Sequence, residues 1–313
     1  MNWPEIPFEP WRDTAHGLHL RLQVVGKIRV ALAPWENHQW HVTLRLTPRG
    51  LTTRPIPHGN GTFSLDLDFV DHTVRVESSN GRRSQLPLEA GSVADFHETL
   101  LGTLDSHGIE VEMHGVPNEL PDPVPFEQDT EARPYDREAV SRWFRVLANT
   151  ARIFEDFRGD FIGKSSPVHF FWGAMDLAVT RFSGRRAPEH PGGIPHLPDW
   201  ITREAYSHEV SSAGFWAGGE SHPEPIFYAY AYPNPAGYPE AEVQPEAARW
   251  NDTLQEFILP YAAVRNARDP GAALQAFLDS TYHAAATLAD WDREPLEWPP
   301  GGRPPVGGRK PEG

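Results

Sequence analysis

The sequence predicts an α+β fold built from two similar halves, each a long helix followed by an antiparallel meander and a closing helix. Some long segments carry apolar residues at helical spacing, and shorter segments between them alternate apolar and polar residues, as half-buried strands do. Because these elements recur in the same order, the halves resemble an internal duplication with pseudo-twofold symmetry, which would place His41 and His169 in related positions. The alternative is that a common architecture recurs by chance, which would give the same order of elements.

The first half contains one long helix, several strands and a second helix. Apolar residues recur every three or four positions over residues 13–32, and Pro34 ends that helix. Ser92 is a typical N-cap, so a second helix is expected from there to Gly108, a residue type that commonly ends helices. Strands are expected over residues 40–47, 62–69, 74–76 and 109–113.

The second half begins after the Pro-rich residues 117–134, which can form neither regular helix nor central strand. Asp136 caps a helix that is expected to end near Gly163, and Asp269 caps a last helix that runs to Leu288. Strands are expected over residues 168–172, 175–182, 210–216 and 226–232.

Four segments follow from this pattern: an N-terminal half, a Pro-rich linker, a C-terminal half with the candidate site, and a Pro/Gly tail that is too poor in apolar residues to pack and is expected to be disordered. They cover residues 1–116, 117–134, 135–292 and 293–313.

The composition excludes several classes of function. The chain has 313 residues, no cysteine and a formal net charge of −15. It therefore lacks disulfides, thiolate nucleophiles and Cys-ligated metal sites. The negative charge opposes nucleic-acid binding, which depends on clustered Lys and Arg. No stretch approaches the ~20 apolar residues of a membrane span, and the first residues do not resemble a leader peptide, so a cytoplasmic protein without a membrane partner is expected.

Polar side chains are concentrated in residues 164–220, among glycines and aromatics, and this density favours a binding site over a packed core. His169 and Asp176 lie on neighbouring predicted strands, where a carboxylate could orient an imidazole for acid–base or metal chemistry. A buried His–Asp pair with a purely structural role fits the same spacing. The adjacent His208 and Glu209 are further catalytic candidates, although on a strand only one of them faces a given site.

Substrate-binding candidates complete this predicted site. Arg181 and Arg203 could clamp an anionic group. Tyr206, Trp172 and Trp216 could form an apolar wall, while packing between sheet and helices is the alternative role for such aromatics.

A metal site would need histidine and carboxylate ligands from distant parts of the chain. The HExxH motif is absent, because Ser212 stands four residues after His208, and the HxxH spacing of His38 and His41 is weak on a strand. The candidate ligands of a divalent metal are His41, His169, His190 and His208. The serine-hydrolase motif G-x-S-x-G and the Gly-rich phosphate-binding motifs are also absent.

Three strings of the sequence resemble an uncharacterised bacterial family that is known only as a domain of unknown function. They are GKIRVALAPWENHQWHVTLRLTPRGLTT, FIGKSSPVHFFWGAMDLAVTRFSGR and REAYSHEVSSAGFW. The resemblance covers nearly the whole chain except the C-terminal tail. It implies one full-length unit and contributes no activity, cofactor or catalytic residue.

The leading hypothesis is an enzyme that binds a small polar or anionic molecule in residues 164–220 and acts through His/Asp acid–base or metal chemistry. The alternative is a non-catalytic protein that binds a small molecule or a protein partner. The sequence does not identify the substrate, the reaction or the oligomeric state.

Overall fold

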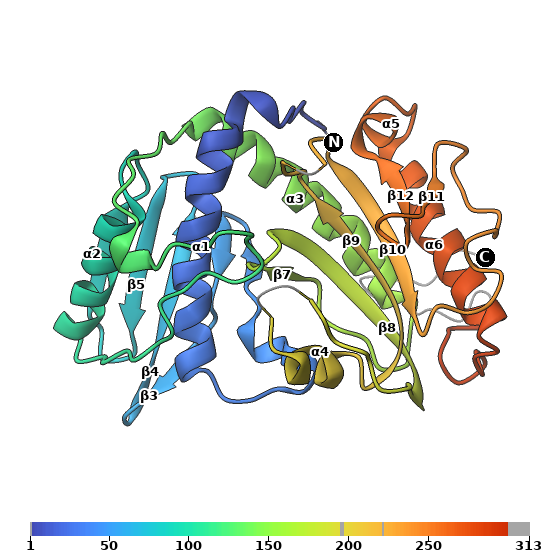
Figure 1. Ribbon diagram of the computed structural model, residues 1–313, viewed down its shortest axis with the longest axis horizontal. Coiled ribbons are helices and arrows are strands. Elements are labelled where there is room, and N and C mark those ends of the chain that lie inside the picture. Colours follow the sequence, from blue (N-terminus) through green and yellow to red (C-terminus); the bar gives the residue numbers. More distant parts are fainter. Residues whose placement is uncertain (1, 195–196, 221, 300–313) are drawn as a thin grey trace, which may run out of the picture.

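The computed structural model describes residues 2–194, 197–220 and 222–299, which form two antiparallel sheets with helices packed against them (Figure 1). This arrangement confirms the α+β class. The long helix α1 (Arg12–Leu32) crosses in front of the first sheet, and α3 (Arg137–Gly159) runs behind the second.

The first sheet has the strand order β1-β2-β4-β5-β6, with β3 also paired to β4. In β4 the apolar residues Phe63, Leu65 and Leu67 are buried and the polar residues between them are half-buried or exposed, as their alternation predicts. Helix α2 (Val93–Ser106) follows, capped by the Ser92 side chain. The strands are β1 (Arg45–Thr47), β2 (Gly50–Thr52), β3 (Ile56–His58), β4 (Gly61–Asp68), β5 (Thr73–Ser78) and β6 (Arg83–Pro87).

The second sheet has the order β11-β12-β10-β9-β8-β7. One of its faces packs on α3 and on α6 (Pro270–Leu288), which are capped by Asp136 and Asp269 as predicted. The short helices α4 (Asp199–Ala205) and α5 (Tyr261–Arg265) complete this part. The strands are β7 (His169–Phe171), β8 (Asp176–Arg186), β9 (His208–Trp216), β10 (Ile226–Tyr232), β11 (Arg249–Asn251) and β12 (Glu256–Pro260).

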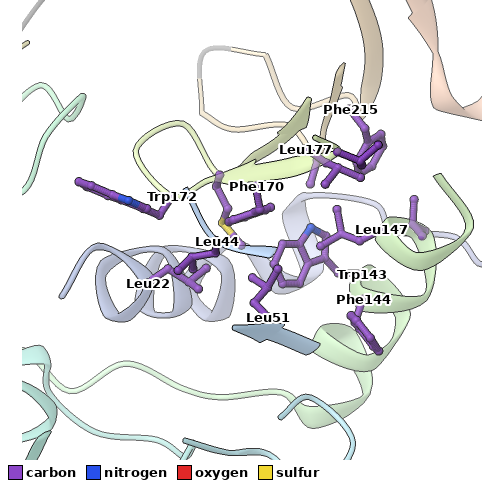
Figure 2. Close-up of a cluster of buried hydrophobic side chains, with 14 of the residues drawn as sticks. Leu22, Leu44, Leu51, Trp143, Phe144, Leu147, Phe170, Trp172, Leu177 and Phe215 are labelled. Carbon is purple, nitrogen blue, oxygen red and sulfur yellow. The ribbon is translucent and has the colours of Figure 1, made fainter. Parts of the chain in front are cut away.

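Leu44 and Phe170 join the two sheets. Each backbone N–H donates to the carbonyl oxygen of the other residue, with both N–O distances 2.9 Å. Their side chains enter one core, where the Trp143 ring lies edge-on to Phe170 at 5.7 Å between centroids (Figure 2). Buried residues of both sheets belong to this one core.

Several sequence predictions fail locally. The strand predicted over residues 40–47 is reduced to β1, because Asn37–Val42 form a short 3-10 segment, η2, in which His38 and Gln39 have left-handed φ angles of 57° and 60°. Residues 109–113 form no strand, and α3 ends at Gly159. Seven further elements were not predicted, since they are short and lack a long apolar period: β2, β3, β6, α4, α5, β11 and β12.

Residues 117–134 contain one short 3-10 segment, Phe126–Gln128, in agreement with their proline content. They pack closely on α1, because the side chain of Gln23 both donates to and accepts from the backbone of Asn118, at 2.8 and 2.7 Å. Residues 293–298, assigned above to the tail, also make ordered contacts. Glu297 accepts from Arg293 and from the Tyr282 hydroxyl at 2.6 Å each. Residues 300–313 lie outside the described residues.

Each sheet has six strands between its long helix and its closing helix, but the two sheets differ in strand order. His41 lies in η2 and His169 in β7, so the two residues do not occupy matching places. The internal duplication, and the division of the chain into two halves and a linker, therefore remain predictions.

Candidate functional site

His169 and Asp176 lie on the same face of the β7–β8 hairpin, but no hydrogen bond joins them. The register pairs His169 with Ala178, which places the imidazole diagonally from Asp176. Asp176 instead accepts a hydrogen bond from the Tyr228 hydroxyl, and burial raises its pKa to about 6. The pKa of His169 is well below its usual value, because of burial and then the positive charge of Arg45. Asp176 therefore does not orient His169.

Arg181 lies on the opposite face of the second sheet. Its side chain is five residues from Asp176 along β8, an odd separation that reverses the direction of the side chain. The guanidinium stacks on Phe157 at 3.4 Å and on Tyr282 at 4.3 Å, and it donates to the Phe157 carbonyl. Arg181 is thus a buried cation of the core and not a clamp for the predicted site.

Arg203 and Tyr206 lie near the other predicted residues without converging on them. Arg203 is exposed, 3.5 Å from Glu189 and 3.7 Å from Asp199. The Tyr206 ring stacks on His190 at 5.0 Å, and its hydroxyl is 2.8 Å from that of Tyr230.

The two candidate tryptophans have separate surroundings. Trp172 packs on Gly26 of α1 and donates its indole N–H to the Val42 carbonyl at 2.8 Å. Trp216 stacks on His222 at 6.0 Å. Glu209 is ion-paired with Arg185 at 2.8 Å. No common site contains these three residues together with His169.

The predicted metal ligands also fail to assemble. Within the part of the chain that the structure describes, no group of three or more His, Asp and Glu side chains could hold a metal ion. His41, His169, His190 and His208 therefore provide no shared metal centre there.

The residues that do converge surround His38 in η2, which packs against α4. His38 is 4% exposed. Glu204 of α4 accepts from the His38 backbone N–H at 2.7 Å and from the Gln39 side-chain amide at 3.2 Å. A left-handed backbone at a non-glycine residue costs on the order of 1–3 kcal/mol and persists only where surrounding contacts determine it. Glu204 provides such contacts to both left-handed residues.

The hydrogen bonds of His38 define its tautomer. Nδ1 lies 3.0 Å from the Ala205 carbonyl oxygen, which can only accept, so Nδ1 carries the proton. Nε2 then presents a lone pair, and it lies 2.6 Å from the Lys164 amine. Burial lowers the pKa of His38, and Lys164 lowers it further, against the effect of the Ala205 carbonyl. The imidazole is therefore held in its neutral form.

Aromatic rings surround the Lys164 amine. It lies 5.0 Å from the Phe182 ring and 5.4 Å from the Trp40 ring. Although the Lys164 side chain as a whole is exposed, desolvation around the amine lowers its pKa, with Glu204 acting in the opposite direction. The His208 ring is 5.6 Å from that of His38. The site thus combines a lysine of lowered pKa with a neutral imidazole, an arrangement that can transfer protons.

Sequence reasoning found this site only in part. Lys164, Glu204 and His208 belong to the polar segment 164–220 that was singled out, whereas His38 was considered only as a weak metal ligand on a strand that does not form. The signal that could have found it is the concentration of His and Trp in residues 35–41, a composition typical of binding sites.

The model of a family described as a family of unknown function, DUF5996, matches residues 3–298. Neither the curated proteins nor the solved structures contain a match. Among the helices of the described residues, none has the length and apolar character needed to cross a membrane.

The raised pKa of Asp176 should make the stability of the folded protein depend on pH. Its pKa is raised to about 6 in the folded protein, so the stability it contributes is complete below its unfolded value near 4 and is lost as the pH rises through about 6. Asp176→Asn keeps an acceptor for Tyr228 and removes this titration. The difference in melting temperature between variant and native protein should therefore rise from pH 5 to pH 8. If this difference does not change with pH, ionisation of Asp176 does not destabilise the folded protein.

Glu204 is predicted to hold η2 in place. Glu204→Ala leaves the buried His38 N–H without an acceptor and should lower the free energy of unfolding in urea by about 1–3 kcal/mol. Glu204→Gln retains one acceptor oxygen and is the matched control, with a smaller expected loss. Equal stability of the alanine variant and the native protein would mean that Glu204 does not support η2.

Proposed function

The chain belongs to the family of unknown function DUF5996, and we propose that it is an enzyme that uses the His38–Lys164 pair for proton transfer on a small anionic molecule. The observation that carries this proposal is the 2.6 Å contact between His38 Nε2 and the Lys164 amine. A neutral imidazole with an unprotonated nitrogen is a general base, and its protonated form returns the proton as a general acid.

The pKa shifts in the pair support this role. Burial lowers the pKa of both groups, which brings a lysine closer to the pH range in which it exchanges protons. The proton on Nδ1 is fixed by the Ala205 carbonyl, so only Nε2 is available for exchange. The Lys164 side chain as a whole is exposed, so the pair lies at the border between the protein and solvent.

The strained backbone supports the same proposal. Strained residues cluster at active sites, and two consecutive left-handed residues that are not glycine place His38 against Lys164. These contacts come from segments about 126 residues apart in sequence. A purely structural histidine would be satisfied by the Ala205 carbonyl without this strain.

A non-catalytic binding protein is the second candidate, and an exposed aromatic pair favours it. Trp35 and Trp200 are 55% and 56% exposed, and their rings stack with centroids 6.2 Å apart. His41 lies 4.8 Å from Trp35, so the pair borders η2. Exposed tryptophans are typical of binding surfaces. Under this alternative the protein converts no ligand, so removing the Lys164 amine changes no reaction rate.

The proposal predicts that both members of the pair are needed for turnover. The native protein, Lys164→Met and His38→Gln would be incubated in D2O with a panel of small phosphates and carboxylates, and NMR would follow substrate loss and deuterium incorporation. Each substitution should reduce the rate at least about 100-fold, the usual contribution of a general acid or base.

Arg203→Gln is the control, because Arg203 is exposed and contacts Glu189, Asp199 and the His190 carbonyl, none of which belongs to the His38–Lys164 pair. Melting temperatures would establish that each variant is folded. Turnover that persists in both Lys164→Met and His38→Gln would contradict the proposal.

A further inference from the structure

Arg45 and His169 are direct neighbours where the two sheets join. Because Leu44 and Phe170 form an antiparallel bridge, the residues next to them, Arg45 and His169, stand opposite each other. Alternation directs their side chains to the face away from the core that Leu44 and Phe170 enter. Cross-strand neighbours on one face lie about 5 Å apart at Cβ, so both side chains can contact one small group.

Each of these side chains has a buried nitrogen without a protein partner. Among the described residues, neither Nη1 of Arg45 nor Nδ1 of His169 has a hydrogen-bond partner, and His169 is only 1% exposed. Buried polar atoms are normally paired. Arg45 Nη1 can only donate, and His169 Nδ1 donates in the tautomer that carries the proton there, so one acceptor group could satisfy both nitrogens.

Positive charge is crowded around this pair in a chain of strongly negative net charge. Burial lowers the pKa of Arg45 to about 10, and the guanidiniums of Arg54, Arg29 and Arg158 lower it further, while Glu36 opposes them. Arg29 is itself buried, and its Nε donates to the His41 carbonyl at 2.6 Å. Four arginines thus lie together here, and Arg158 is ion-paired with Glu155 at 3.6 Å.

We propose that Arg45 and His169 bind a phosphate group, with Arg29 and Arg54 supplying further positive charge. A phosphate dianion offers several acceptor oxygens and two negative charges, which match two donors in a crowd of cations better than one carboxylate does. The inference rests on the proposed function, and it specifies the anionic substrate as a small phosphate ester.

Trp40 connects this subsite to the His38–Lys164 pair. Its ring lies 5.4 Å from the His38 ring and 6.4 Å from the His169 ring. The Trp40 indole thus contacts both the His169 ring of the proposed subsite and the His38 ring of the pair. The subsite takes the role first predicted for Arg181 and Arg203, which lie elsewhere.

The test is calorimetric titration of the full-length protein with inorganic phosphate, with acetate as the monoanionic comparison. Arg45→Met should weaken phosphate binding by about 10- to 100-fold, the equivalent of one charge-assisted hydrogen bond. Without phosphate the same variant should melt at a higher temperature than the native protein, because the repulsion between the Arg45 guanidinium and the neighbouring arginines is removed. Arg203→Met is the control and should bind phosphate as the native protein does.

NMR of the native protein is a second measurement and needs no variant. Addition of phosphate should shift the His169 imidazole signals. The inference is overturned if phosphate leaves these signals unchanged, if Arg45→Met binds phosphate normally, or if acetate binds as tightly as phosphate. Lys164→Met should keep phosphate binding while it loses turnover. Unchanged turnover in that variant would therefore refute the proposed function and leave the phosphate subsite standing.

Discussion

The backbone bridge between Leu44 and Phe170 is the constraint on which the rest of the molecule depends. It holds the two sheets together and directs two apolar side chains into the core around Trp143 (Figure 2). The same pairing sets Arg45 against His169 on the other face. It also fixes the end of η2, so that this segment meets α4 and Lys164. Both parts of the proposed site thus follow from one antiparallel contact.

The two faces of the second sheet differ in polarity. Helices α3 and α6 cover one side and bury its apolar residues together with Arg181. The other side carries His169, Asp176 and a row of half-buried tyrosines on β10, with α4 in front of its lower end (Figure 1). His169 and Asp176 are buried on this face, and burial shifts the pKa values of both.

The sequence predicts the regular elements well where local signals are strong. The caps at Ser92, Asp136 and Asp269 were correct, because capping depends on neighbours in sequence. The separation of Arg181 from Asp176 was also within reach, since an odd spacing on one strand reverses the face. His38 was not. Its left-handed backbone depends on Glu204, which is 166 residues away, and no local pattern carries that contact.

The central claim is that His38 is a neutral imidazole whose Nε2 exchanges protons with Lys164. Nitrogen-15 NMR of the histidine rings in the native protein measures this directly. The account predicts that His38 carries its proton on Nδ1 at pH 7 and remains neutral below the usual histidine pKa near 6.5, and that the Nε2 signal changes in Lys164→Met. A His38 ring that is charged at pH 7, or protonated on Nε2 alone, would contradict it.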